Sequence, residues 1–474
     1  MEEIEFKFSV DWTKSAFYCG LDVHEHELAV ALYSQDDSAS EFLKTSIFST
    51  DSEGLRQFWS FVKKYHPAAF AMEATGIYHH LIYKFLSKKR EKVRWPFKIL
   101  VVNPSDVAGL PGRQKADKID AEHLAIYLAK GLLKPGQPVI EVLEDLKHVF
   151  RTAARLEKDR TALKNRIKKT LDRAGIRPKA LDLNCQWVNE FLLHFIGQKE
   201  TLGACIKKIF DDETLLREHR NKIKKNMNKF APYFEFSLTD AQRALIRQDL
   251  IELDFITARK ELLAVEIDNV VLERPGLRQK AHLLATIPGI SPFSALWILA
   301  EIGGIKRFKT REAFSAYCGC CPRVVSSAGK VYSAHVSRHS NKFLKTIFYN
   351  AAVVLCNLTK QESTLKRFAT RTMRQKGKFS TKLAYCIVAS KIAKIAFSLL
   401  MKNTCFHPNY GISTPPSKKE EGKNFSVSDR KTLRRARNCL KRVSSIEDIG
   451  VIGSFSEQLA LQLELTLQGK KIGD

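Results

Sequence analysis

The sequence has no apolar run of about 18 residues or more, and it begins with a mixed, acidic segment, MEEIEFKFSVDW. A membrane-spanning helix needs roughly 20 apolar residues, and a signal peptide needs a basic start followed by an apolar core. We therefore expect a cytoplasmic protein without a membrane partner.

The ten cysteines are scattered along the chain, which is typical of free thiols in a reducing compartment. Cys318, Cys320 and Cys321 lie close together, but no second Cys/His pair follows at zinc spacing. Their pattern favours buried free thiols over a metal site.

Acidic residues are in the minority, since 51 of them stand against 78 lysines and arginines, for a formal net charge of +27. The 474 residues are 44% hydrophobic and 27% charged, which predicts a folded chain with room for several domains. Such an excess of positive charge suits a polyanion, DNA or RNA, better than it suits an anionic membrane surface.

Strand-like and helix-like patterns alternate through residues 1–135. The expected strands are 17–23, 27–33, 42–49, 68–73 and 97–102. One helix should begin at Asp51 or Ser52, and another should cover 116–130. An early β-meander followed by alternating helices and strands predicts an α/β sheet with mixed pairing.

Four acidic residues occupy distinctive places in this pattern. Asp22 lies in the first expected strand and Glu73 ends a later one, while Asp117 and Asp120 stand three residues apart on a helix and so share a face. Carboxylates are the ligands that Mg²⁺ or Mn²⁺ prefers, and two such ions can assist displacement at a phosphodiester. The layout is that of an RNase H-like, RuvC-type nuclease. Any one of these acids alone is better explained as a surface charge, and it is the four together in these contexts that favour the metal site.

Long helices are expected in the middle of the chain. A heptad pattern of apolar residues runs from Val142 to Ile167, and a second long helix is expected over 239–272. The pattern predicts a spacer at 136–280 that packs as a coiled coil or a helical hairpin. Residues 176–236 receive no assignment.

The second half of the chain contains a turn, Ile287-Pro288-Gly289-Ile290, between two expected helices. This is typical of a helix–hairpin–helix, in which Pro288 and Gly289 would meet a nucleic-acid phosphate; an ordinary Pro-Gly turn is the alternative. A loop-rich segment is expected at 318–330, and a helix over 366–402. A linker at 407–425 precedes a basic helical patch.

The ordered series GLDVH, MEATG, VNPSDV and KADKIDAEHLA resembles the N-terminal DEDD domain of the IS-one-ten family of insertion-sequence transposases. IPGISPFSALWILAEIG, AYCGCCPRVVSSAGK, SRHSNKFLKTIFYNAAVV and GKFSTKLAYCIVASKIAKIAFSLL resemble the C-terminal domain of the same family. The likeness covers roughly residues 15–135 and 280–405.

The resemblance implies a RuvC-like domain that binds divalent metal, and a serine that attacks DNA to form a phosphoserine bond. The family position of that serine corresponds to Ser327, with Ser326 as second choice, and Ala328 stands where the family usually has Gly. Characterised members use a structured bridge RNA, so a guide RNA is an implied partner beside donor and target DNA. The basic residues flanking the serine would neutralise phosphates; they are Arg323, Lys330, Arg338, Lys342 and Lys345.

Four regions follow: a RuvC-like DEDD domain at 1–135, the helical spacer at 136–280, a mainly α C-terminal transposase domain at 281–405, and a linker with a basic tail at 406–474. A spacer of this kind suits a homodimer or tetramer. The leading hypothesis is a metal-assisted DNA recombinase that uses Ser327. The alternatives are a RuvC-like junction nuclease that uses water, and a nucleic-acid-binding scaffold without activity.

Overall fold

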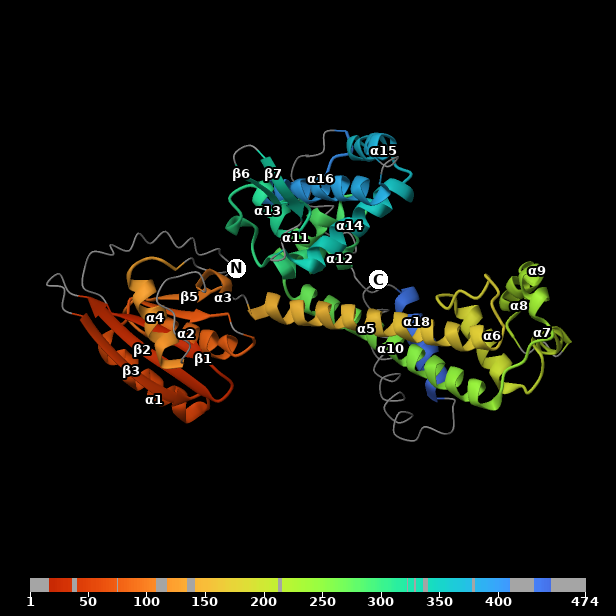
Figure 1. Ribbon diagram of the computed structural model, residues 1–474, viewed down its shortest axis with the longest axis horizontal. Helices are drawn as coiled ribbons and strands as arrows, with labels where there is room; N and C mark the ends of the chain where they lie inside the picture. Colours follow the sequence, from red (N-terminus) through yellow and green to blue (C-terminus); the bar gives the residue numbers. More distant parts are fainter. Residues whose placement is uncertain are drawn as a thin grey trace. The chain divides into compact units, whose positions relative to one another are not determined.

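The computed structural model describes residues 17–35, 41–74, 76–107, 117–133, 141–211, 215–321, 323–327, 330–335, 340–376, 380–409 and 430–444. The chain divides into two compact units. The first comprises Met1–Glu144 with Ile302–Lys309, and the second comprises Asp145–Glu301 with Thr310–Asp474. Figure 1 shows a sheet in the first unit and an assembly built mainly of helices in the second.

A five-stranded sheet of order β3-β2-β1-β4-β5 forms the centre of the first unit. The strands are β1 (Tyr18–Val23), β2 (Glu27–Gln35), β3 (Glu41–Ser49), β4 (Ala69–Glu73) and β5 (Lys98–Val102). β1, β2 and β3 pair antiparallel, whereas β4 lies parallel to β1 and to β5. The predicted mixed sheet is confirmed, and this order and direction of strands are those of an RNase H-like domain.

Helices cover both faces of this sheet because each strand alternates its side chains between two apolar layers. Leu21 and Phe70 pack against α1 (Ser52–Val62) and α2 (His79–Lys92) on one face. Tyr18, Ala69 and Ala71 pack on the other face against α4 (Asp117–Ala129). The short elements of the unit are η1 (Lys63–Tyr65), α3 (Pro104–Val107) and η3 (Ile305–Arg307).

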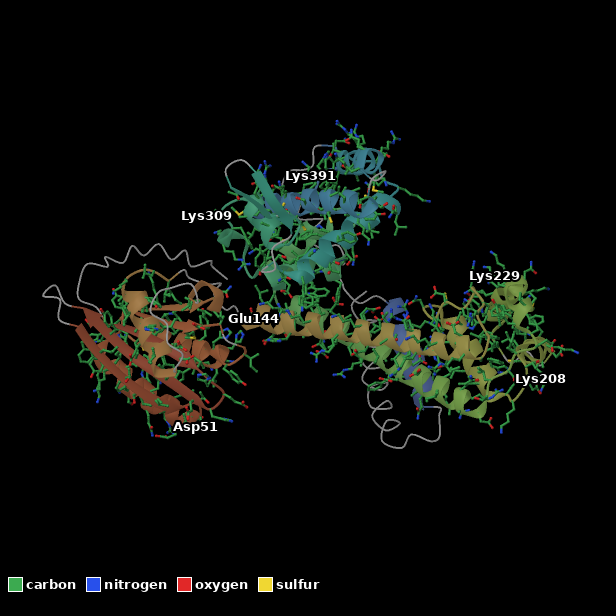
Figure 2. The ribbon with its side chains drawn as sticks, viewed as in Figure 1. Asp51, Glu144, Lys208, Lys229, Lys309 and Lys391 are labelled. Carbon is green, nitrogen blue, oxygen red and sulfur yellow. The ribbon has the colours of Figure 1, made fainter. Side chains whose placement is uncertain are left out.

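The start of α1 is fixed by Asp51, one of the two predicted caps. Its carboxylate accepts a hydrogen bond from the Gly54 backbone N–H at 2.7 Å, which satisfies a donor that the helix itself leaves unpaired. Asp51 is labelled in Figure 2.

Two long helices, α5 (Glu141–Arg173) and α10 (Asp240–Leu272), pack along one another in the second unit. Lys260 pairs with Glu157, and Arg166 pairs with Asp249 at 2.9 Å, so the two helices run antiparallel. The start of α10 at a capping box confirms the predicted helix over 239–272. The pairing is that of a helical hairpin within one chain, and an intermolecular coiled coil remains a prediction.

Short helices join α5 to α10 where the sequence left 176–236 unassigned. They are α6 (Gln186–Gly197), α7 (Leu202–Asp211), α8 (Arg217–Lys225), α9 (Met227–Phe230) and η2 (Ala231–Tyr233). Phe191, Phe195 and Phe230 are fully buried where these helices pack on the ends of α5 and α10. The segment is therefore a compact cap on the long pair.

The next helices after α10 are α11 (Pro275–Ala285), α12 (Pro292–Ile302), α13 (Arg311–Tyr317), α14 (Lys342–Asn357), α15 (Thr364–Lys376) and α16 (Thr381–Lys402). Two predictions are corrected here. The expected loop at 318–330 contains β6 (Arg323–Ser327), which pairs antiparallel with β7 (Lys330–His335), because the valines and the tyrosine of these two segments favour strands. The single helix expected over 366–402 is two helices, and the Ser380 hydroxyl caps the second.

α16 is long and apolar enough to cross a membrane, with a mean hydropathy of 1.7 over its most apolar window. Lysines interrupt its sequence, so it contains no unbroken apolar run of about 18 residues. Its buried side chains include Val388, Ile392 and Leu399, and it packs against α13, α14 and α15. The packing is that of a core helix.

The basic patch near the C-terminus forms α18 (Arg430–Ser444), which packs on α10 through Leu433, Ala436 and Leu440. Arg442 makes a bidentate ion pair with the buried Asp254, at 2.7 and 2.6 Å. Part of this basic helix therefore contacts α10 and is not available to a partner.

All ten cysteines are free, as predicted. No group of three or more His, Cys, Asp or Glu suited to a metal ion occurs among the described residues. Burial raises the pKa of the Cys320 thiol to about 12, so this thiol stays protonated at neutral pH and is a poor ligand.

Candidate functional site

The close approach of α4 to β1 determines the geometry of the acidic site. A Cβ on Gly20 would lie 2.0 Å from the Ala121 carbonyl oxygen and 2.5 Å from the Ala125 backbone nitrogen. Only glycine fits between strand and helix here. The role of Gly20 was not predicted, although a glycine inside an expected strand, two residues before an acid, is a signal of close backbone approach.

Asp22 and Glu73 lie at neighbouring positions on the side of the sheet that α4 covers. Leu21 pairs with Met72 in the parallel β1–β4 register, so Asp22 and Glu73 come next along the two strands. Asp22 follows Gly20 by two residues and Glu73 follows Ala71 by two, which returns each to the α4 face. The two carboxylates therefore stand together at the carboxyl ends of parallel strands.

Asp117 and Asp120 open α4 on the same side of the sheet. The later part of this helix, with Leu124 and Leu128, packs near Tyr18 at the start of β1, so the first turn of the helix is directed toward the end of β1. Asp117 precedes Ala121 by one turn and Asp120 precedes Leu124 by one turn, so both positions continue the sheet-facing stripe. Asp120 is half-buried, and the side chain of Asp117 is not among those described.

His24 also belongs to this part of the molecule. Its Nε2 lies 3.1 Å from Oδ2 of Asp22, whose side chain is only 13% exposed. Tyr78, by contrast, donates its hydroxyl to Glu25 at 3.3 Å. No role was predicted for His24, although it follows Asp22 by two residues.

This donor set fits a hard divalent cation. It consists of carboxylates from two strand ends and one helix start, and such cations prefer oxygen ligands while keeping waters for a phosphate. The described side chains do not by themselves form a complete ligand cluster.

Ser327 is the last residue of β6, where it pairs with Lys330, the first residue of β7. A register shift between Val325 and Ser326 makes a β-bulge directly before it. Bulges redirect the residues beside them and often adjoin active sites. Both serine candidates therefore lie at the tip of a hairpin.

The segment at Tyr317–Gly319, before the hairpin, adjoins the N-terminus of α14. Asn341 caps this helix, since its side chain accepts hydrogen bonds from the backbone N–H groups of Phe343 and Leu344 at 2.9 and 3.1 Å. Gly319 has a φ of +67°, and a Cβ there would lie 3.3 Å from the Lys345 Cβ. Lys345 thus lies beside Gly319, four residues before β6, and its contact with phosphate stays a prediction.

A buried carboxylate, Glu301, holds this region in place. It accepts two hydrogen bonds from the Arg151 guanidinium, both at 3.0 Å, and one from the Asn341 amide at 2.7 Å. Trp297 donates to it at 3.3 Å and stacks on Phe150. Glu301 thereby ties the start of α5 to the cap of α14, a role that no local sequence pattern signals.

The structure describes the other predicted nucleic-acid-binding residues to different extents. Lys342 is exposed in the first turn of α14, whereas only the backbones of Arg323 and Lys330 are described, and Arg338 lies outside the described residues. Pro288 and Gly289 form the turn between α11 and α12, while the helix–hairpin–helix contact of this turn with phosphate stays a prediction. A Cβ on Gly289 would lie 2.5 Å from the Ala351 carbonyl oxygen of α14, so one side of this turn is packed.

Two sequence families match the chain. Residues 19–176 match a family described as Transposase, the DEDD transposase of IS110, and residues 281–368 match the Transposase IS116/IS110/IS902 family. A probable family 20 transposase of Pseudomonas aeruginosa is 24% identical over 74% of this chain and 89% of its own length. The transposase for insertion sequence element IS1111A of Coxiella burnetii is 22% identical over 65% of this chain and 72% of its own.

Two further similarities cover less of the chain. A pilin gene-inverting protein of Moraxella bovis is 27% identical over 28% of this chain and 40% of its own. A Thermus thermophilus RuvC structure matches 25% of this chain and 99% of its own, at 13% identity and a TM-score of 0.20.

The first unit is an RNase H-like domain with acidic residues at its strand ends, and two segments of the chain match transposase families. Together these features define a DNA-acting transposase. The chain belongs to the IS110 family of insertion-sequence transposases.

Proposed function

We propose that this transposase cuts and rejoins DNA through a phosphoserine intermediate on Ser327, with Mg²⁺ or Mn²⁺ held by Asp22, Glu73, Asp117 and Asp120. The observation that carries the proposal is the meeting of Asp22 and Glu73 with the start of α4 on one side of an RNase H-like sheet.

The covalent chemistry is a reversible exchange of phosphoester bonds. A bond forms between Ser327 Oγ and phosphorus as the bond from phosphorus to a deoxyribose oxygen breaks; the serine gives up its proton, and the departing oxygen gains one. Rejoining is the reverse reaction with a different deoxyribose hydroxyl, which restores the serine. When bound, the divalent ion would neutralise charge on the phosphate oxygens during displacement.

The serine is tested by trapping the protein on a nicked DNA substrate. We expect a covalent protein–DNA adduct that Ser327→Ala abolishes and that Ser326→Ala, one residue away on the same strand, retains. Cleavage without any adduct would show that water is the nucleophile and would favour a junction nuclease. Loss of the adduct in Ser326→Ala alone would move the role to the neighbouring serine.

The carboxylates are tested by titrating the metal. Asp22→Asn and Asp120→Asn should each weaken the Mg²⁺ dependence of cleavage and reduce the rise in melting temperature that Mg²⁺ produces. Full activity in both variants would contradict the proposed metal site and support a scaffold role.

We also propose that the active form is a homodimer or tetramer that combines acids from one protomer with Ser327 from another. Support comes from the long α5–α10 pair, which offers an elongated surface for self-association. Mixing Asp120→Asn protein with Ser327→Ala protein should restore part of the strand exchange. No recovery in any mixture, with wild-type protein active, would contradict this arrangement.

A structured guide RNA is proposed as a partner that pairs with donor and target DNA in the cytoplasm, at the bacterial nucleoid. The net charge of +27 supports the binding of more than one polyanion. RNA bound to purified protein should be protected from nuclease, and its removal should abolish strand exchange between specific sites. Unchanged site selection after removal would contradict the guide.

A further inference from the structure

Helix α15 carries only positive charge. Its sequence, TLKRFATRTMRQK, holds five lysines and arginines and no acidic residue in 13 positions. Arg367, Arg371 and Arg374 are spaced by four and three residues, so they lie along one face, and all three side chains are exposed. None of the predicted nucleic-acid contacts falls on this helix.

The opposite face fixes α15 in place. Leu365, Ala369 and Thr372 are buried, and the helix packs against α14 and α16. Lys366 donates to the carbonyl oxygens of Leu355 and Cys356 at 2.9 Å, which satisfies the last turn of α14. Lys366 therefore stabilises the packing of α15 on α14, whereas the three arginines are exposed on the opposite side of the helix.

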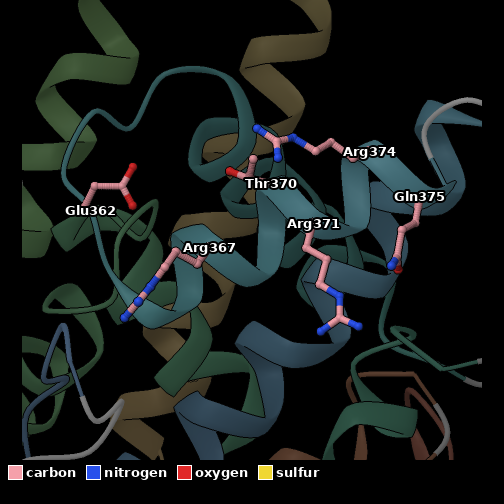
Figure 3. A pocket seen from close by; sticks show the side chains of 6 residues that line it. All are labelled: Glu362, Arg367, Thr370, Arg371, Arg374 and Gln375. Carbon is pink, nitrogen blue, oxygen red and sulfur yellow. The ribbon is translucent and has the colours of Figure 1, made fainter.

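Among the described residues, the three guanidiniums have no carboxylate partner and make no hydrogen bond. They line an open pocket of about 410 Å³ with the Thr370 hydroxyl, the Gln375 amide and the Glu362 carboxylate (Figure 3). Three positive charges against one negative charge leave the lining basic. A basic surface that is not neutralised within the protein is the expected footprint of an anionic partner.

The shape of this charge pattern suits the backbone of a duplex. No aromatic side chain lines the pocket, and Phe368 is covered by Lys391, whose Nζ lies 5.9 Å from the ring centre (Lys391 is labelled in Figure 2). Single strands are gripped by stacking their bases on aromatic rings, which this surface does not offer. Seven residues of helix span about 10 Å, which is about three phosphate steps along the axis of duplex DNA.

We propose that the face formed by Arg367, Arg371 and Arg374, the α15 arginine face, binds the phosphate backbone of duplex DNA independently of sequence. Guanidiniums bind phosphate oxygens in a bidentate manner, and Thr370 and Gln375 add neutral hydrogen-bonding groups. The site rests on the proposed function only in taking DNA as the partner. It would hold a DNA arm while chemistry proceeds at Ser327.

The test is the salt dependence of binding to an unrelated DNA duplex, measured by fluorescence anisotropy with the full chain. The variant R367Q/R371Q/R374Q removes three cations and keeps good helix formers. Each phosphate contact contributes about 0.9 to the slope of log K against log salt, so we expect the slope to flatten by about 2.7. The affinity advantage of wild type over variant should then shrink about 40-fold between 50 and 200 mM salt.

A matched control removes the same charge elsewhere. Arg217, Arg247 and Arg259 are exposed on α8 and α10, and R217Q/R247Q/R259Q should leave the slope within about one unit of wild type, the size of one contact. A triple Arg→Lys variant of the α15 arginine face should retain most binding. Equal flattening in the control and the test variant, or an unchanged slope in the test variant, would overturn the proposal.

A second arm uses a structured RNA in place of the duplex. If the α15 variant lost affinity for RNA while its affinity for duplex DNA stayed the same, the assignment to DNA would be wrong. Binding to uncut duplex needs neither Ser327 nor metal. A failure of the phosphoserine chemistry therefore leaves this result intact, and a failure here leaves adduct formation intact.

Discussion

The change Gly20→Ala tests whether the seating of α4 on β1 positions the acidic site. The new methyl group would lie 2.0 Å from the Ala121 carbonyl oxygen, and contacts under 3.0 Å are essentially never seen for a Cβ. Both close atoms, including the Ala125 nitrogen, belong to the helix backbone, so no side-chain rotation relieves the clash. The helix must move away from the strand by about 1 Å, taking Asp117 and Asp120 with it.

Two consequences are expected. Overpacking of this kind costs about 1–3 kcal/mol in the free energy of unfolding. A displacement of about 1 Å between the two halves of a metal site should slow DNA cleavage about 100-fold, because catalytic groups act only in near-attack geometry. The rise in melting temperature caused by Mg²⁺ should shrink as well, since fewer ligands would then reach one ion.

The assays are denaturant unfolding, Mg²⁺-dependent thermal shift and DNA cleavage, all on the full chain. Gly276→Ala in α11 is the matched control, because a Cβ there meets nothing within 4 Å. It should leave cleavage unchanged and stabilise by up to about 1 kcal/mol. Wild-type stability and cleavage in Gly20→Ala would refute the reasoning. So would rescue by Ala121→Gly, which removes a side chain but not the clashing backbone oxygen.

Two further predictions concern buried charges. Arg442→Ala should lower the free energy of unfolding by about 3–5 kcal/mol, because Asp254 is 5% exposed and would lose its bidentate partner. Arg435→Ala, on the same helix, should lower it by under about 1 kcal/mol, since the hydrogen bond from Arg435 to Glu261 is exposed. Equal losses in the two variants would contradict the idea that burial sets the cost. Glu301→Gln should lower the free energy of unfolding by about 1.5–3 kcal/mol, because its hydrogen bonds would no longer end on a charged group, while Asn341 would keep an acceptor. A loss below about 0.5 kcal/mol in denaturant unfolding would contradict a structural role for Glu301.

Local signals predicted much of the first unit. Period-two apolar patterns located all five strands, and the cap at Asp51 located α1, because these features depend on residues adjacent in sequence. The capping box at Thr239 fixed the start of α10 for the same reason. The hairpin at 323–335 escaped prediction, because its strands are short and carry polar residues that also suit a loop.

The sequence alone determined the four acids, the serine candidates, the basic charge and the family likeness, since each is a matter of which residues occur in which order. Only the tertiary structure decided that Asp22 and Glu73 adjoin, because parallel register joins strands some 50 residues apart. The structural role of Gly20 follows from the packing of α4 against β1. The role of Glu301 follows from its hydrogen bonds with Arg151 and Asn341, which are distant in the sequence. The surroundings of the α15 arginines are likewise set by packing between distant segments: among the described residues no carboxylate pairs with them, although Glu362 lines the same pocket.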